Sequence, residues 1–273
     1  KYGNIIEHLF SLTPDMNQEL ILQDLVIVVP AKNHKTTLLS ADFLKCSGTI
    51  PDNWELARQP INANNVSQVV FTNGIAITAE PQRIMFAQSI RNVDGESILI
   101  PEIAQKYASA LPNMELEAVG INPRGYVPLT TGEQDNARQY ITENLLSPGA
   151  WQSIGEAPMR ASLNLVYKLQ RAPLYLNVTE AALQAENQSE EITPIIMFGG
   201  SFSYELSGEN NSEKLAQFHS VLNNWQTDLD EYRDIINHKF LGQSAPQQVL
   251  PTGEYNLETN NNLETNNLFA VSA

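Results

Sequence analysis

Apolar and polar residues alternate with a period of two in two groups of segments, as expected of β-strands that bury one face. The segments are residues 66–72, 75–79 and 83–90 in the first group, and residues 161–169, 174–178 and 192–206 in the second. Asn73-Gly74 joins the first two segments and is typical of a two-residue hairpin turn. Each group therefore predicts an antiparallel β-meander.

Two further segments predict single strands. Residues 20–30 contain the continuous apolar run 25–29, which is typical of a strand covered on both faces. Residues 114–121 show a weaker alternation. Inside the segment 192–206, the pair Gly199-Gly200 interrupts the pattern, and paired glycines in a strand indicate either a β-bulge or a close backbone approach.

A helical period of three to four residues marks the remaining apolar segments, which are residues 4–12, 98–111, 132–146 and 212–241. The last segment has the most regular stripe, formed by Leu215, Phe218, Leu222, Trp225, Leu229, Tyr232 and Ile236. Asn210 and Gly242 suit the N-cap and the C-cap of such a helix. A helix of about 30 residues is about 45 Å long, so it must lie across a sheet or pair with a partner.

This order of elements predicts an α+β fold, in which antiparallel β-meanders are separated by helices and one long C-terminal amphipathic helix packs on the sheet or on a partner. We expect residues 1–242 to form a single α+β domain, with 20–128 and 129–242 as two similar halves if the domain arose by duplication. Residues 243–273 are polar and contain a repeated Asn-Leu-Glu-Thr-Asn-Asn segment, so they predict a flexible or strap-like tail.

The charge balance argues against nucleic-acid binding. The chain has 273 residues with 16 basic and 31 acidic side chains, a net charge of −15, which repels phosphate backbones and anionic membrane surfaces. Its densest basic stretch holds only Arg160, Lys168 and Arg171. We therefore expect no nucleic-acid partner, and the apolar runs are too short to predict membrane insertion.

Cysteine usage favours a reducing compartment. Cys46 is the single cysteine, so the chain forms no internal disulfide. No basic segment followed by an apolar segment opens the chain, and a secretory signal peptide is therefore not expected. Together these features predict a cytoplasmic protein.

No arrangement of side chains predicts catalysis. His8, His34, His219 and His238 lack the spacing of metal ligands, and the chain has no phosphate-binding glycine loop. Asp228, Asp230 and Asp234 crowd one part of the last helix, where Asp230 and Asp234 are suitably spaced to share a divalent cation, but a solvated face explains the run better. We therefore predict no catalytic residue, no metal ligand and no cofactor.

The most site-like local sequence is residues 120–126, which we expect to form a turn at the end of a strand. It brings together Asn122, Arg124 and Tyr126 as candidate binding residues. Arg124 is suited to hold a carboxylate or phosphate with two hydrogen bonds. The simpler alternative is a structural turn in which Arg124 pairs with a nearby acid.

Three functions follow from these features. The leading hypothesis is a non-enzymatic protein that acts through protein–protein contacts, as an adaptor or assembly subunit, with a protein partner or self-association. The second is a carboxylate- or metal-dependent hydrolase whose site is assembled from distant segments. The third is a small-ligand binding module at the 120–126 turn.

Overall fold

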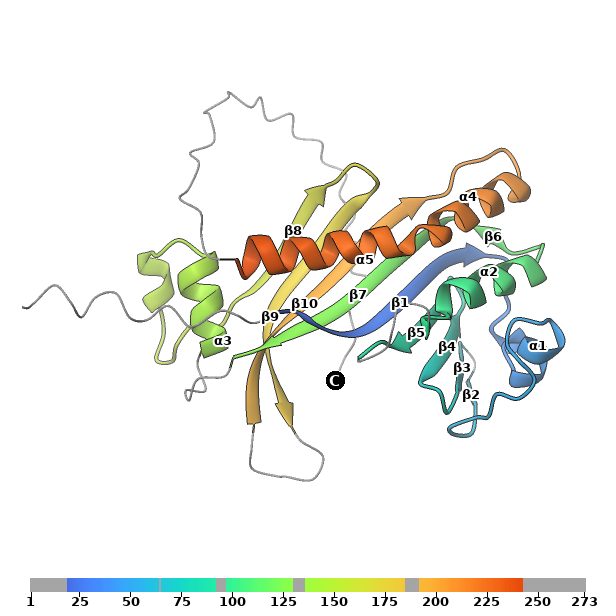
Figure 1. The fold of residues 1–273 in the computed structure, drawn as a ribbon, viewed down its shortest axis with the longest axis horizontal. Coiled ribbons are helices and arrows are strands. Elements are labelled where there is room, and N and C mark those ends of the chain that lie inside the picture. Colours follow the sequence, from blue (N-terminus) through green and yellow to red (C-terminus); the bar gives the residue numbers. More distant parts are fainter. Residues whose placement is uncertain (1–18, 64, 92–96, 130–135, 185–191, 243–273) are drawn as a thin grey trace, which may run out of the picture. The chain divides into compact units, whose positions relative to one another are not determined.

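The structure is a computed structural model that describes residues 19–63, 65–91, 97–129, 136–184 and 192–242 (Figure 1). The helix expected at 4–12 and the tail 243–273 lie outside the described residues. The described part is a mixed α+β structure built on one large antiparallel sheet, which confirms the α+β class and the antiparallel pairing that the sequence predicts.

Among the described residues the sheet has ten strands, nine of them in the order β2-β3-β4-β5-β1-β7-β10-β9-β8, and the short β6 pairs with β1. The strands are β1 (Ile21–Lys32), β2 (Ile61–Ala63), β3 (Val66–Val70), β4 (Ile75–Glu80), β5 (Arg83–Ser89), β6 (Glu115–Leu116), β7 (Ala118–Pro128), β8 (Ser162–Lys168), β9 (Pro173–Gln184) and β10 (Ile192–Glu205). The two expected meanders are β3–β4–β5 and β8–β9–β10. They are joined through β1 and β7, which pair with each other at the centre.

Strand β1 differs from the sequence prediction because only one of its faces is covered. Leu25, Ile27 and Val29 are buried, whereas Val26 and Val28 between them are partly exposed. β-Branched side chains suit a half-exposed sheet face as well as a buried one. A continuous apolar run therefore does not distinguish the two environments.

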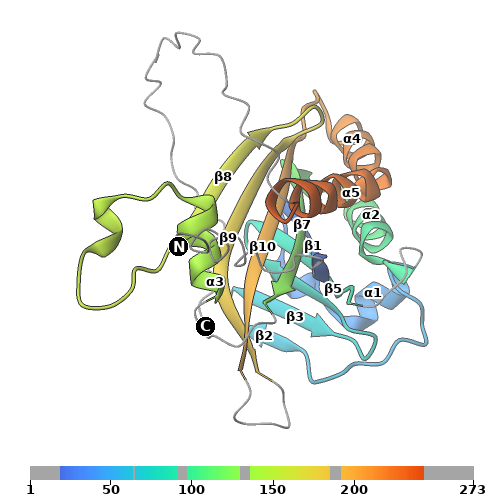
Figure 2. The ribbon, with the colours of Figure 1, turned by 60° about the vertical axis from the view of Figure 1, so that its left-hand side comes forward.

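The helices are α1 (Ala41–Cys46), α2 (Ile100–Ala110), α3 (Asn136–Gln139), α4 (Asn211–Asn223) and α5 (Trp225–Asp234), and a π-helical segment follows α3 over Tyr140–Leu145. Figure 2 shows α2, α4 and α5 together on one side of the sheet. Helices α2, α4 and α5 pack on the central strands β1, β5 and β7, and α3 packs on β9 and β10. The opposite side of the sheet, the open face, carries no helix in the described part of the chain.

The C-terminal helical region is divided, unlike the single helix expected over 212–241. Helix α4 ends before Asn224, α5 follows, and Ile235–Phe240 forms a π-helical segment. Asn224 leaves the helical conformation with φ −113° and ψ 17°, and its side chain donates to the Ser220 carbonyl oxygen at 2.8 Å. Asparagine favours such local bonds to the backbone, which explains the break.

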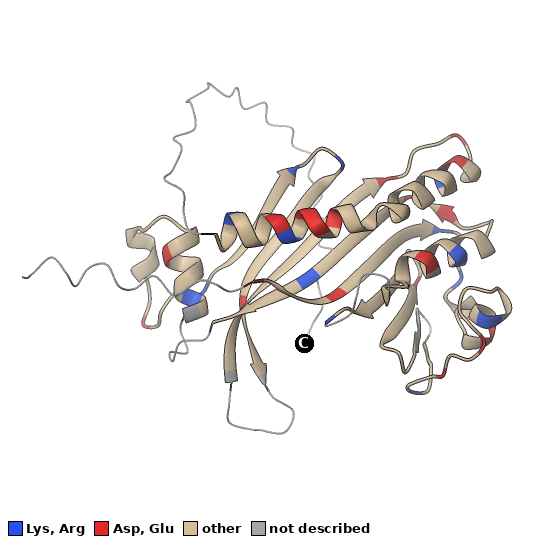
Figure 3. Ribbon diagram, viewed as in Figure 1, with Lys and Arg blue, Asp and Glu red and all other residues tan. Residues whose placement is uncertain are grey.

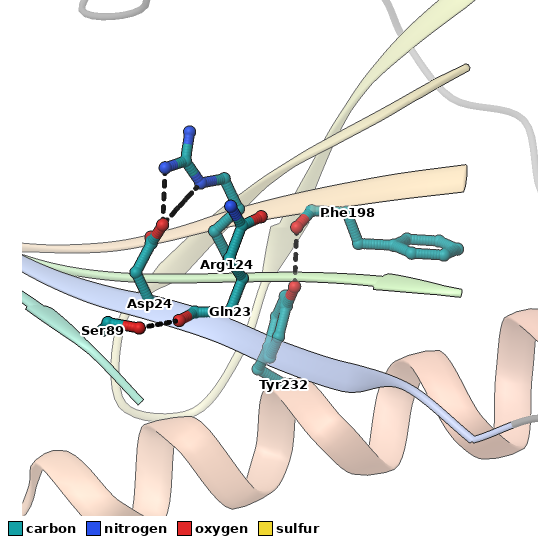
Figure 4. A network of polar contacts seen from close by, with 6 residues as sticks. All are labelled: Gln23, Asp24, Ser89, Arg124, Phe198 and Tyr232. Carbon is teal, nitrogen blue, oxygen red and sulfur yellow. Dashed lines mark hydrogen bonds and ion pairs between the residues drawn. The ribbon is translucent and has the colours of Figure 1, made fainter. Parts of the chain in front are cut away.

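The packing of α5 on the sheet explains the second glycine of the pair in β10, Gly200. The pairing of β10 with β9 runs through Gly199 and Gly200 without a shift, so the bulge alternative is wrong. A Cβ atom on Gly200 would lie 2.8 Å from Cδ2 of Tyr232, which is fully buried. The Tyr232 hydroxyl donates to the Phe198 carbonyl oxygen at 2.7 Å (Figure 4). Glycine is therefore needed at position 200 because an aromatic side chain lies against the strand.

The start of α2 depends on a side chain from the sheet. Leu99, the N-cap residue, provides no capping side chain. Instead, the buried Gln88 on β5 accepts hydrogen bonds from the backbone N–H groups of Leu99 at 2.8 Å and Ile100 at 3.3 Å. Its amide nitrogen donates to the Ser97 carbonyl oxygen at 2.8 Å. One side chain thus satisfies three backbone groups that the helix itself leaves without partners.

Candidate functional site

Residues 120–126 form part of strand β7 and not a turn, so the turn prediction is wrong. This segment pairs with β1 on one side and with β10 on the other. The composition Asn-Pro-Arg-Gly favours a turn locally, but pairing on both sides outweighs that preference. Asn122 donates from Nδ2 to the Val26 carbonyl oxygen at 3.0 Å, which occupies its side chain in the sheet.

Arg124 pairs with Asp24 on the neighbouring strand β1. Its Nε lies 3.0 Å and its Nη2 lies 2.5 Å from Oδ2 of Asp24 (Figure 4). Tyr126 is buried, and the guanidinium carbon of Arg91 lies 5.9 Å from the centre of its ring. Each predicted binding residue therefore has a partner within the chain, and a ligand at Arg124 would have to compete with Asp24.

A group that the sequence prediction missed joins the β8–β9 turn to helix α5. Asp228 has 0% exposed surface, and its Oδ1 accepts a hydrogen bond from the Tyr204 hydroxyl at 2.7 Å. Nε of Arg171 lies 3.5 Å from the same oxygen, and Nη1 of Arg171 donates to the Asn224 carbonyl oxygen at 3.2 Å. The group links the end of the β8–β9 hairpin to the break between α4 and α5.

The expectation of a solvated acidic face is wrong for Asp228. Asp230 and Asp234 are well exposed, with 74% and 65% of their side chains accessible, but Asp228 is buried. Burial raises the pKa of Asp228, against the lowering effects of the Tyr204 hydrogen bond and the Arg171 charge. Position 228 lies three residues after Trp225 and four before Tyr232, so helical spacing already placed it on the buried side.

The raised pKa of Asp228 predicts a pH-dependent stability. Because its pKa is higher in the folded than in the unfolded chain, Asp228 binds more protons in the folded state, and its contribution to stability falls as the pH rises from about 4. Asp228→Asn removes this titration. We expect the free energy of unfolding of the wild type, relative to Asp228→Asn, to decrease between pH 4 and pH 7 in urea titrations. If the difference in the free energy of unfolding between the wild type and Asp228→Asn stays constant or increases over this range, the pKa of Asp228 is not raised in the folded chain.

A shallow groove of about 430 Å³ lies between α2 and α4, and brings Ser109 close to His219. The distance from Ser109 Oγ to His219 Nε2 is 3.3 Å. The Ser109 hydroxyl donates to the Gln105 carbonyl oxygen at 2.8 Å, as helical serines commonly do. Its proton is therefore directed to the helix backbone, and the pair lacks the geometry of a nucleophile activated by a base.

The open face carries an exposed apolar pair next to the sheet edge. Val166 on β8 and Tyr175 on β9 are cross-strand partners, with 66% and 44% of their surfaces exposed. Beside them, Asn177 Nδ2 donates to Asn164 Oδ1 at 2.9 Å. We call these four residues the β8–β9 patch. The alternation of residues 161–169 indicated that β8 has two different faces, but it did not indicate that β8 is the last described strand of the sheet.

The described residues contain no group of three or more histidine, cysteine, aspartate or glutamate side chains placed to hold a metal ion. Among them there is also no helix that is long and apolar enough to cross a membrane. No known family model matches the chain. No curated protein matches its sequence significantly.

Proposed function

We propose that this protein is non-enzymatic and acts through protein–protein contacts, as an adaptor or assembly subunit. The observation that supports this most directly is the β8–β9 patch on the open face. Exposed aromatic and β-branched side chains that lie together are typical of sites that a partner covers. We also propose a cytoplasmic location, since Cys46 has no second cysteine with which to pair.

The charge distribution supports the choice of this surface. Figure 3 shows acidic residues concentrated on α5, while the strands β8, β9 and β10 are mostly uncharged along their length. From residue 157 to residue 179 the chain has no acidic side chain, although its net charge is −15. The centre of a protein interface is usually depleted in charged residues. The β8–β9 patch has this character and the acidic helix face does not.

Tyr175→Thr tests the proposal because β9 is paired on both sides, so the change alters the open face without affecting a sheet edge. The matched control is Leu38→Thr, since Leu38 is an apolar residue with a similar exposure of 41% outside this sheet face. We expect Tyr175→Thr, and not Leu38→Thr, to reduce self-association measured by light scattering or the recovery of specific proteins from extracts of the source cells.

Two observations together would contradict the proposed function. If the wild type is a monomer at all concentrations, and if no protein is recovered in a Tyr175-dependent manner, the proposed function is wrong. Circular dichroism and urea titrations of both variants show whether each retains the fold.

The two alternative functions remain proposals of lower rank. A small-ligand site at Asn122, Arg124 and Tyr126 requires that Arg124 exchange Asp24 for the ligand. A carboxylate-dependent hydrolase requires acids that converge, and the described residues hold no such group of three.

A further inference from the structure

Strand β8 is the last strand of the sheet, and no described strand lies on its outer side. Asn177 on β9 donates from Nδ2 to the Leu163 carbonyl oxygen at 3.3 Å, so this carbonyl points toward β9. Backbone groups of successive residues in an antiparallel strand point to opposite sides. The N–H and C=O groups of Ser162, Asn164 and Val166 therefore point outward, away from β9.

This edge lacks the features that usually prevent a strand from pairing. Strand β8 contains no proline, and its register with β9 is regular from Ser162 to Lys168. Natural proteins commonly protect an exposed edge with proline, a bulge or charges within the strand. Here the only charged residue in the strand is Lys168, at its end. The edge is suited to accept another strand.

A basic side chain lies at each end of the edge. Lys168 is exposed at one end. At the other end lies Arg160, whose exposed guanidinium also contacts the carboxylate of Glu180. The remainder of the chain is strongly acidic. A strand with acidic residues at both ends and an uncharged centre would complement this edge.

The same charges disfavour a second copy of this chain as the added strand. Antiparallel pairing of two β8 strands about Leu165 places each Lys168 opposite Ser162 of the other copy. Lys168 then lies diagonal to Arg160 of that copy, at a separation of about 7–8 Å. Like charges at this distance repel each other, and both copies carry a net charge of −15 in addition.

We propose that the outer edge of β8 binds an extended segment of a partner protein, which joins the sheet as an additional antiparallel strand. The segment has acidic residues at both ends and β-branched residues between them. Backbone hydrogen bonds to Ser162, Asn164 and Val166 provide the binding, and the cationic ends select the sequence. This inference rests on the proposed function, and specifies how a protein partner is held.

The first test uses a fluorescent nine-residue peptide, Glu-Glu-Val-Thr-Val-Thr-Val-Glu-Glu, with blocked ends, and measures binding by anisotropy. We expect saturable binding to the full chain that weakens with added salt. Two further peptides carry N-methyl groups on alternate residues, one on the odd and one on the even positions. Only the set whose N–H groups face β8 should lose affinity, by about tenfold or more. A peptide with lysine in place of glutamate should bind more weakly by about threefold or more.

The second test changes the edge of the protein. Val166→Pro removes one outward N–H donor at an edge position that tolerates proline, and Val166→Thr is the control that keeps this donor. We expect Val166→Pro to weaken binding of the acidic peptide by about tenfold and Val166→Thr to change it by less than about threefold. Lys168→Glu should weaken the acidic peptide and strengthen the lysine peptide.

Three results would each overturn the inference: no saturable binding of the acidic peptide, equal affinity of the two methylated peptides, or equal effects of Val166→Pro and Val166→Thr. The methylated peptides use the wild-type protein, so this comparison holds even if Val166→Pro fails to fold. If the peptide experiments fail while Tyr175→Thr still disrupts a protein contact, then the edge inference is wrong and the proposed function stands.

Discussion

Replacing Tyr232 with alanine is expected to destabilise the folded chain by about 3–5 kcal/mol, because a fully buried aromatic ring is lost and a cavity remains between α5 and the sheet. The change also leaves the Phe198 carbonyl oxygen without the hydroxyl that now donates to it at 2.7 Å. Urea denaturation followed by circular dichroism measures the effect. Tyr232→Phe keeps the ring and should cost only about 1–3 kcal/mol, which is the contribution of the hydrogen bond.

The contact of Tyr232 with Gly200 can be tested with a double-mutant cycle. Gly200→Ala places a methyl group 2.8 Å from Cδ2 of Tyr232, and should cost about 1–3 kcal/mol in the wild type. After Tyr232→Ala the same methyl group enters vacated space, so most of that cost should disappear. Additive effects of the two changes would show that the ring and the glycine do not restrict each other.

Replacing Gln88 with leucine is expected to destabilise the fold by about 3 kcal/mol, the second largest effect we predict. The change removes the acceptor for the N–H groups of Leu99 and Ile100 and the donor to the Ser97 carbonyl oxygen. These backbone groups lie at the start of α2, where burial of an unpaired polar group is costly. Urea denaturation again gives the magnitude.

Gln68→Leu is the matched control for Gln88→Leu. Gln68 lies on β3 and bonds to the side chains of Arg58 and Thr78, which are not part of a helix terminus. Its replacement should cost less than about 1 kcal/mol, since no backbone group loses a partner. Similar costs for the two changes would mean that Gln88 does not cap α2.

The predicted interaction surface and the predicted stabilities concern opposite faces of the sheet. Tyr232, Gln88 and Asp228 belong to the helix-covered face, and changes there should affect stability first. Val166 and Tyr175 lie on the open face, where substitutions alter contacts with little effect on the core. Variants of the two kinds therefore separate loss of folding from loss of binding.

Residue patterns were sufficient to predict most of the strands and the antiparallel α+β class. Period-two alternation located β3, β4, β5, β8 and β10 because one face of each is more buried than the other. Gln88 continues the buried positions Ile84 and Phe86, so a polar residue on the core face was detectable from the sequence. The hydrogen-bond partners of Gln88 were not detectable from the sequence, because they lie at the start of α2, a separate element.

The candidate site was less accessible to sequence reasoning. The turn expected at residues 120–126 is a strand because β1 and β10 lie on either side of it, and both are distant in the sequence. Asp228 was placed among solvated acids although its helical spacing puts it on the buried side, and its partners, Arg171 and Tyr204, come from other elements and were not detectable. Local preference decides such a segment only when no long-range pairing competes with it.

The sequence alone determined the alternation of the strands, the helical stripe, the net charge of −15 and the lack of acidic residues between positions 157 and 179. Only the tertiary structure decided the strand order, which places β8 at the edge of the sheet among the described residues. It also decided that Tyr232 lies against Gly200 and that Asp228 is buried. Alternation and charge follow from neighbouring residues, whereas edges, open faces and buried charges depend on which distant segments pack together.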